Sequence, residues 1–159
     1  MLKYTNCLVT FSEVPDEISL CINISNCPIH CFGCHSPELW GDIGSELTKA
    51  TLQDLIMSND GITCVTFMGG DAEPTKVNEL SKWVHDYYDN RIRTCWYSGQ
   101  DSHPTFVPDF DYVKIGPYIE ELGPINVKTT NQKMVKIHHD SERWYMEDIT
   151  YKFWNDTNS

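Results

Sequence analysis

The stretch LCINISNCPIHCFGC, residues 20–34, joins an alternating apolar segment directly to three closely spaced cysteines. Residues 20–24 alternate with a period of two, which predicts a β-strand. Cys27, Cys31 and Cys34 follow with the spacing C-x3-C-x2-C. This short spacing lets one loop wrap a single metal centre, and thiolates are soft ligands that select iron–sulfur clusters or zinc. The stretch therefore predicts a metal-binding loop at the end of a strand.

The number of local ligands bears on which metal this loop holds. Three cysteines leave one iron of a cubane cluster without a protein ligand, and such an open iron can bind a substrate or cofactor. A closed structural zinc site needs four ligands, and the fourth could be His30, His35 or a distant cysteine. Zinc motifs more often carry two C-x2-C pairs, and the sequence has no second pair. We therefore favour a [4Fe–4S] cluster and keep structural zinc as the alternative.

Strand-like and helix-like segments alternate along the rest of the chain. Apolar residues at helical spacing predict helices over residues 48–58 and 75–89. Segments rich in β-branched and aromatic residues predict strands over residues 61–68, 92–97, 112–115 and 135–138. This order implies βαβ units in a mainly parallel sheet. A closed eight-unit barrel takes about 250 residues, so we expect a partial, laterally open (βα) barrel of about five or six units.

Two glycine turns follow predicted strands. Gly69-Gly70-Asp71 ends the strand at 61–68; its glycines would let the backbone approach a ligand, and its carboxylate could accept hydrogen bonds from an ammonium group. Ser98-Gly99 ends the next strand, where Ser98 could bond a ligand carboxylate or ribose, or only stabilise the turn. Because active sites of such folds lie at the carboxyl ends of the strands, we expect the cysteine loop and both turns at one edge of the sheet.

The composition narrows the classes of partner and compartment. A chain of 159 residues predicts one domain, and its formal net charge of −11 argues against binding to nucleic acid or to an anionic membrane. The acidity suits a cationic small molecule or a basic patch on a protein partner, or serves only to keep the protein soluble. We find no transmembrane stretch or secretory signal, so we expect a cytoplasmic protein, in which disulfides are rare. The remaining cysteines are expected to be buried, inert thiols: Cys7, Cys21, Cys64 and Cys95.

These motifs resemble those of the radical S-adenosylmethionine (SAM) superfamily. Within it, the chain is similar to the small enzymes that activate anaerobic ribonucleotide reductase, over roughly residues 4–135. The similarity rests on the cysteine loop with Trp40 six residues beyond its last cysteine, on Gly69-Gly70-Asp71, and on the later segments 97–99, 115–118 and 129–132. The resemblance implies a single radical SAM domain over residues 1–159, in which the tail from about residue 150 is not placed.

The resemblance also implies cofactors, a reaction and partners. Cys27, Cys31 and Cys34 would hold a [4Fe–4S] cluster whose open iron binds SAM. A radical SAM oxidoreductase of this kind cleaves SAM reductively to a 5′-deoxyadenosyl radical, which generates a glycyl radical on the large subunit of anaerobic ribonucleotide reductase. An external electron donor such as flavodoxin or ferredoxin is implied, whereas no catalytic acid or base is. The SAM-binding residues implied are Gly33, Gly69, Gly70, Asp71 and Ser98.

The chain departs from the family pattern in three places. Residues 13–17 stand where many members have Gly-Pro-Gly, Ala72-Glu73 separates Gly-Gly-Asp from Pro74, and Gly33 replaces the usual aromatic residue before the third cysteine. His35, directly after that cysteine, is a candidate for a supporting contact to the cluster.

Three alternative functions remain open from the sequence. A radical SAM enzyme acting on a small molecule would turn over without any reductase. A ferredoxin-like electron carrier would need four cysteine ligands and would not bind SAM. A zinc-stabilised binding module would be colourless and inactive in redox chemistry.

Overall fold

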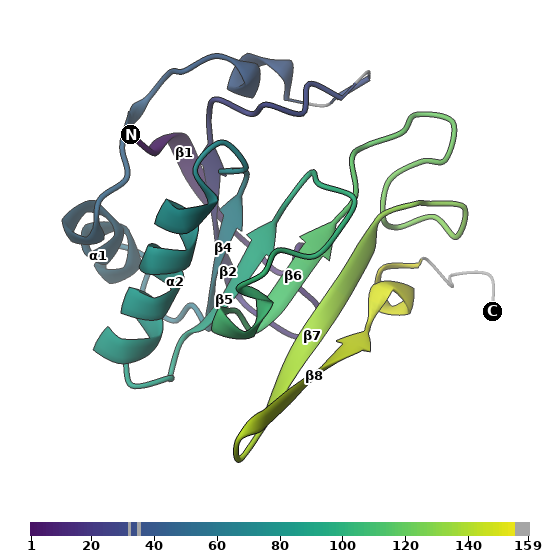
Figure 1. Ribbon diagram of the computed structural model, residues 1–159. Coiled ribbons are helices and arrows are strands. Elements are labelled where there is room, and N and C mark those ends of the chain that lie inside the picture. The colour runs from purple at the N-terminus through teal and green to yellow at the C-terminus, as the bar shows by residue number, and fades with distance from the viewer. Residues whose placement is uncertain (32, 35, 155–159) are drawn as a thin grey trace.

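The computed structural model describes residues 1–31, 33–34 and 36–154, and its centre is one eight-stranded mixed sheet (Figure 1). The strand order is β3-β1-β2-β4-β5-β6-β7-β8. The strands are β1 (Lys3–Thr10), β2 (Ser19–Ile24), β3 (Ser45–Glu46), β4 (Cys64–Met68), β5 (Arg93–Tyr97), β6 (Tyr112–Ile115), β7 (Lys133–Asp140) and β8 (Arg143–Asp148). The helices of the described residues are α1 (Lys49–Met57), α2 (Pro74–Tyr87) and three short 3-10 helices, η1 (Pro37–Trp40), η2 (Val107–Asp109) and η3 (Thr150–Phe153).

The prediction of a partial, laterally open (βα) barrel of five or six units is wrong. Only β2, β4, β5 and β6 pair in parallel, whereas β1, β3, β7 and β8 join the sheet by antiparallel pairing. Two α-helices accompany this sheet in the described part of the chain, which is too few for such a barrel. The sequence pattern missed β1 and β8 because neither has a buried residue and so neither shows apolar alternation.

The predicted elements in the middle of the chain are confirmed, with boundaries shifted by a few residues. Thr48 caps α1, because its hydroxyl oxygen accepts a hydrogen bond from the Thr51 N–H at 3.1 Å. Pro74 is the first residue of α2, where its missing N–H costs no helical hydrogen bond. Both helices lie on one face of the sheet and serve as the crossovers that make β2, β4 and β5 parallel (Figure 1).

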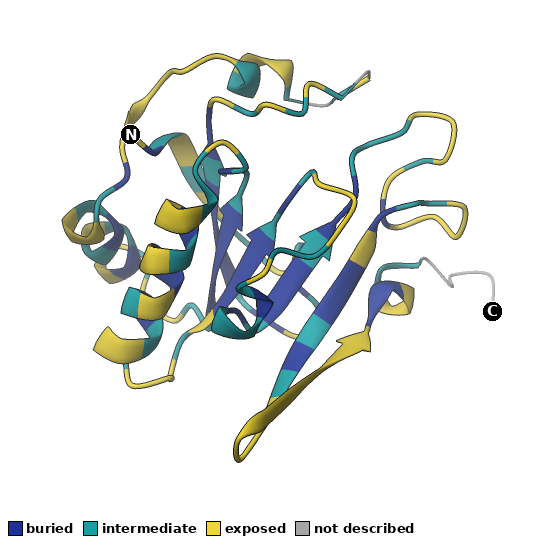
Figure 2. Cartoon of the chain, in the orientation of Figure 1, coloured by how far each residue is buried: buried dark blue, intermediate teal, exposed yellow. Residues whose placement is uncertain are grey.

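The sheet separates two apolar clusters, and its central strands are buried (Figure 2). The larger cluster lies between the sheet and the two helices and contains Leu52, Phe67 and Trp96. The smaller cluster lies on the opposite face and contains Cys64, Cys95, Tyr112, Ile125, Met134 and Ile149. Of the described helices, none is both long and apolar enough to cross a membrane.

The β1–β2 loop closes over this second face and becomes part of the core. Val14, in the stretch where the family pattern is interrupted, is fully buried in the smaller cluster. Glu17 accepts hydrogen bonds from the hydroxyls of Tyr112 and Thr63, each at 2.7 Å, and its carboxylate lies 3.7 Å from Arg93 Nε. Burial, together with the neighbouring Glu17 carboxylate, raises the pKa of Tyr112 well above its usual range. The β1–β2 loop is thus held against the second face of the sheet by both apolar packing and hydrogen bonds.

The buried side chain of Phe67 gives a test of this core. Because Phe67 is fully buried between β4 and the helices, Phe67→Ala is expected to lower the free energy of unfolding by about 3–5 kcal/mol. Met57→Ala, at an exposed position of α1, is the control and should change it by no more than about 0.5 kcal/mol. Urea denaturation followed by circular dichroism measures both, and equal effects of the two variants would contradict this core.

Candidate iron–sulfur site

The candidate site lies where the four parallel strands end. Parallel strands place their carboxyl ends at the same edge of a sheet, so the segments that follow β2, β4, β5 and β6 meet there. One cavity of about 210 Å³ collects side chains and turns from all four segments. Its lining includes Cys27, Cys31, Cys34, Gly69, Asp71, Ser98, Gly99, Gly116 and Tyr118. The predicted meeting of the cysteine loop with both glycine turns is therefore present in the structure.

Two of the three candidate thiols receive backbone hydrogen bonds. The Tyr118 N–H donates to Cys31 Sγ at 3.3 Å, and the Ser36 N–H donates to Cys34 Sγ at 3.4 Å. Burial raises the pKa of Cys31, the neighbouring Cys34 and Cys27 raise it further, and the Tyr118 N–H partly offsets this rise. N–H donors at thiolate sulfurs favour the charged form and help to set the reduction potential of iron–sulfur clusters.

The donors around the cavity fit a sulfur-rich cluster. Trp40 lines the cavity, and its buried Nε1 has no hydrogen-bond partner among the described residues. A sulfur atom of a bound cluster could accept the hydrogen bond that this N–H lacks. In residues 1–31, 33–34 and 36–154, no three His, Cys, Asp or Glu side chains converge to hold a single metal ion. Thiolates of a cubane bind different irons, so they need a shared cavity rather than a common point.

Of the two histidines considered as further ligands, the structure describes His30 and not His35. His30 stacks on Trp40 with ring centroids 4.7 Å apart, at a residue whose φ is +50°. This stacking places its imidazole against the indole in the wall of the cavity. His35 lies outside the described residues, as does Phe32.

Asp71 connects the two glycine turns that the sequence suggested separately. Its Oδ1 accepts a hydrogen bond from Ser98 Oγ at 2.5 Å, and its Oδ2 accepts one from the Gly99 N–H at 2.8 Å. Ser98 Oγ in turn accepts a bond from the Gln100 N–H at 3.1 Å. A carboxylate offers about four acceptor positions, so Asp71 can hold the second turn in place and still accept bonds from a ligand.

The glycines of the predicted site serve the backbone in different ways. Gly69 lines the cavity with φ +113°, and a Cβ there would lie 2.9 Å from the Ile24 carbonyl oxygen. Gly70, with φ +95°, faces the apolar side of α2, where a Cβ would meet a side-chain carbon at 2.5 Å. Gly33, with φ +77°, packs against Tyr118. The structure thus places Gly69 at the cavity, whereas Gly33 and Gly70 shape the turns beside it.

Two later segments, noted in the sequence only through the family resemblance, support the Cys31 thiol together. Gln132 Nε2 donates to the Gly116 carbonyl oxygen at 3.3 Å, and Asn131 Nδ2 donates to the Pro117 carbonyl oxygen at 3.0 Å. These bonds hold the backbone immediately before the Tyr118 N–H that reaches Cys31. No local pattern in the sequence could show that residues 131–132 act on a cysteine a hundred positions earlier.

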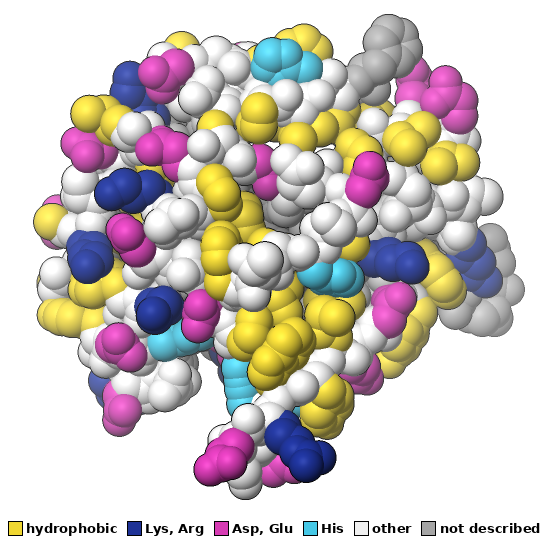
Figure 3. All heavy atoms as spheres, in the orientation of Figure 1, with side chains coloured by type: hydrophobic (Ala, Val, Ile, Leu, Met, Phe, Trp, Pro, Cys, Tyr) yellow, Lys and Arg dark blue, Asp and Glu magenta, His cyan; other side chains and the backbone are white. Residues whose placement is uncertain are grey.

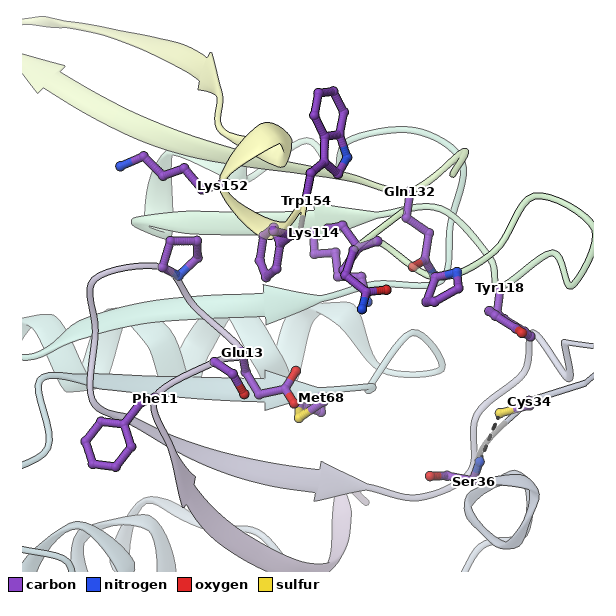
Figure 4. Close-up of a pocket in the computed structure, with 16 residues that line it drawn as sticks. Phe11, Glu13, Cys34, Ser36, Met68, Lys114, Tyr118, Gln132, Lys152 and Trp154 are labelled. Carbon is purple, nitrogen blue, oxygen red and sulfur yellow. Dashed lines mark hydrogen bonds between the residues drawn. The ribbon is translucent and has the colours of Figure 1, made fainter. Parts of the chain in front are cut away.

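A second cavity, of about 860 Å³, continues from the first (Figure 4). The two cavities share several wall residues: Cys34, Ser36, Met68, Lys114, Tyr118 and Gln132. The far walls come from the β1–β2 loop, including Phe11 and Glu13, and from the C-terminal segment, including Lys152 and Trp154. Figure 4 shows Cys34 and Tyr118 at one end of this space and Phe11 at the other.

Lys114 is the residue of this wall that sequence reasoning missed. Its Nζ lies 4.4 Å from the centre of the Tyr97 ring, and no ion pair to it is present among the described residues. The Tyr97 hydroxyl donates to the backbone and side-chain oxygens of Glu13. Burial lowers the pKa of Lys114, and the nearby Glu13 partly offsets this. The sequence does carry one signal for this position, because Lys114 is a charged residue within the otherwise apolar strand Tyr112–Ile115.

The three cysteines can be tested by iron content. Replacing Cys27, Cys31 or Cys34 by alanine is expected to remove most of the iron from protein reconstituted with iron and sulfide, because each thiolate binds its own iron. Cys7→Ala is the matched control, since this thiol lies in β1 outside the cavity and should leave the iron content unchanged. Iron and sulfide assays with visible absorption measure the effect, and retention of a full cluster after any of the three substitutions would exclude that ligand.

The charge of Lys114 predicts a pH-dependent stability. Its pKa is lower in the folded than in the unfolded chain, so the ammonium opposes folding at neutral pH, and this cost disappears as the pH rises through both values. Lys114→Met is therefore expected to raise Tm at pH 7, by about 2–4 °C for each 1 kcal/mol gained, and the gain should shrink toward pH 10. Lys82→Met, at an exposed position, is the control. Thermal unfolding measures both, and a lowered Tm for Lys114→Met would show a strong favourable contact of the ammonium.

Comparison with known families supports an iron–sulfur cluster at this site. A family model described as a 4Fe-4S single cluster domain matches residues 18–103, which is more than half of the chain. The matched range contains Cys27, Cys31, Cys34, the Gly69-Gly70-Asp71 turn and Ser98. Neither the curated proteins nor the solved structures include a match to this chain. The chain therefore belongs to the 4Fe-4S single cluster domain family and is an iron–sulfur protein.

Proposed function

We propose that this protein is a radical SAM activating enzyme that generates a glycyl radical on anaerobic ribonucleotide reductase. The observation that carries the proposal is the shared cavity, in which three cysteine thiols lie beside the Gly69 turn and the Asp71–Ser98 pair. A cluster bound by three thiolates has an open iron, and this cavity extends from the thiols to polar groups that could hold a second ligand. SAM is a ligand of the required kind, since its amino and carboxylate groups can bind such an iron.

The remaining cysteines support a three-ligand cluster. Cys64 and Cys95 are fully buried in the apolar cluster on the second face of the sheet. Burial raises the pKa of each thiol well above its usual range, which disfavours the thiolate that iron requires. None of the four remaining cysteines, Cys7, Cys21, Cys64 and Cys95, lines the cavity of Cys27, Cys31 and Cys34. This arrangement favours the proposal over a ferredoxin-like electron carrier, which needs a fourth cysteine ligand.

The residues around the cavity suit the binding and orientation of SAM. The Asp71 carboxylate, already fixed by Ser98 and Gly99, has acceptor positions left for an ammonium group. Gly69 brings the backbone close to the cavity without a side chain in the way. When bound and reduced, the [4Fe–4S] cluster would supply the electron that cleaves SAM to methionine and a 5′-deoxyadenosyl radical. The protein's part is to hold SAM in one orientation and to exclude water.

The larger cavity is where a protein substrate would enter. It joins the cluster cavity through Met68, Lys114 and Tyr118 and extends toward the β1–β2 loop and the C-terminal segment. A glycine-containing segment of the reductase could occupy it and bring a Cα hydrogen near the cleaved SAM. An external one-electron donor, such as flavodoxin or ferredoxin, completes the proposed set of partners.

A second candidate function is favoured by the size of this cavity. A volume of about 860 Å³ is within the range that buries a small organic ligand. The β1–β2 loop and the segment ending at Trp154 supply walls that the sequence did not predict. A radical SAM enzyme acting on a small molecule therefore remains the alternative, and it would need no reductase.

Electron paramagnetic resonance of the reconstituted, reduced protein tests the proposal. We expect a cubane signal that changes shape when SAM is added, and a glycyl radical signal once the purified reductase is present. Asp71→Ala should keep the iron but weaken the response to SAM by about tenfold or more, because each lost hydrogen bond to a charged group contributes about 1.5–3 kcal/mol. Cys7→Ala is the control that should behave as the unchanged protein.

Other outcomes of this measurement identify the alternatives. A cluster signal indifferent to SAM would indicate an electron carrier. SAM cleavage without any radical on the reductase would favour a small-molecule substrate. One zinc per chain, with no cluster, would exclude the enzyme.

A further inference from the structure

One cationic side chain faces the cavity that the three cluster cysteines share. Among the described residues that line this cavity, Lys114 is the only Lys or Arg, and Asp71 is the only Asp or Glu. Lys114 lies on β6, and its side chain is partly buried. Side chains that line one cavity face each other without a layer of protein between them. The Lys114 ammonium and the three thiolates therefore act on each other through a partly buried space.

The contacts of Lys114 hold its ammonium in place without neutralising it. The Nζ lies 4.4 Å from the centre of the Tyr97 ring, which is a cation–π contact. The Tyr97 hydroxyl donates to Glu13, and this bond fixes the ring. Glu13 is nearby, but no ion pair to Lys114 is present in the part of the chain that the structure describes. Burying a charge costs free energy unless an opposite charge compensates it, so this ammonium suits a neighbouring anion.

A [4Fe–4S] cluster held by Cys27, Cys31 and Cys34 would be such an anion. The negative charge of three thiolates exceeds the positive charge of the oxidised cubane core. Reduction takes one electron from the external donor and adds no proton, so the bound cluster becomes more negative by one unit charge. A fixed positive charge in the same cavity therefore stabilises the reduced form more than the oxidised form.

We propose that Lys114 raises the reduction potential of the cluster by stabilising its reduced form electrostatically. Lys114 neither binds an iron nor transfers a proton in this role, and it contributes only its charge and the place where Tyr97 holds that charge. The proposal rests on the three-cysteine cluster of the proposed function, but it does not depend on SAM or on the reductase.

The other charges of the protein act in the opposite direction. The formal net charge is −11, and Asp and Glu side chains are scattered over the face shown in Figure 3. Water and salt screen such surface charges. Near a protein interior the effective dielectric constant is about 20, against about 80 in water, so charges that face one cavity interact about four times more strongly. Lys114 is therefore placed to outweigh the distant carboxylates and to offset Asp71 in the same cavity.

An anaerobic redox titration of the reconstituted protein, without SAM and followed by electron paramagnetic resonance, tests the proposal. Lys114→Met keeps an unbranched side chain but removes the charge, and it is expected to lower the equilibrium constant for reduction about three- to tenfold. At 59 mV per tenfold for a one-electron couple, the midpoint potential falls by about 28–59 mV. Lys114→Arg retains the charge and should stay within about twofold of the unchanged chain, which is about 18 mV.

Lys152→Met is the matched control, because it neutralises a lysine that lines the larger cavity but not the cluster cavity. The Lys152 Nζ lies 3.0 Å from Asp16 Oδ2, and Figure 4 shows its side chain far from Cys34. This variant should keep the potential within about twofold of that of the unchanged chain. The shift caused by Lys114→Met should persist at about 1 M salt, where the contributions of surface charges are screened out.

Two measurements separate the charge of Lys114 from its packing. Without a cluster no anion offsets the burial of the ammonium, so Lys114→Met should raise Tm of the cluster-free chain while it lowers the potential of the loaded protein. A loss of packing alone would not produce both effects. Iron and sulfide assays confirm that each variant carries a full cluster, and Lys114→Gln supplies the neutral side chain if Lys114→Met assembles the cluster incompletely.

Three results would overturn the proposal: a potential unchanged in the neutral variant, an equal shift in Lys152→Met, or a potential of Lys114→Arg as low as that of Lys114→Met. The last result would assign the effect to the shape of the side chain rather than to its charge. A cluster that is reduced normally but is indifferent to SAM would contradict the proposed function and leave this comparison of potentials intact.

Discussion

The parallel pairing of β2, β4, β5 and β6 is the constraint on which the site depends. Parallel strands point their carboxyl ends in one direction, and the turn after each of them must therefore lie at the same edge. Residues that lie far apart in the chain become neighbours by this rule alone. The crossover helices α1 and α2 make the pairing possible, and they need the buried face of the sheet to pack against.

Hydrogen bonds between neighbouring turns then give the edge a defined shape. The Asp71 carboxylate ties the β4 turn to Ser98 and Gly99 after β5. The amides of Asn131 and Gln132 hold the backbone after β6, whose next N–H reaches Cys31. Each turn is thus positioned by the one beside it, so a cofactor would meet preformed donors rather than a flexible loop. Such preorganisation reduces the entropy cost of binding.

The second face of the sheet carries buried polar groups beside its apolar cluster. The β1–β2 loop lies over this face, where Val14 packs in the apolar cluster and Glu17 receives two hydroxyl hydrogen bonds. Lys114 and Glu13 remain close to the larger cavity, with Tyr97 between them. Charges in such a partly buried space interact more strongly than in water. The iron–sulfur loop therefore lies beside a larger cavity with charged residues in its wall, and Glu13 and Lys114 of that wall lie outside the residues that the family model matches.

The sequence by itself determined the local features of this protein. The cysteine spacing identified the iron–sulfur loop, and periodicity located both helices and the central strands, because these signals depend only on neighbouring residues. Tertiary structure decided the rest: the mixed sheet in place of the expected barrel, the outer strands β1 and β8, the Asp71–Ser98 link and the position of Lys114 in the cavity wall. Outer strands without a buried residue show no periodicity, and contacts between distant segments follow from the order and direction of the strands. Those properties arise only when the whole chain packs, so no local pattern could contain them.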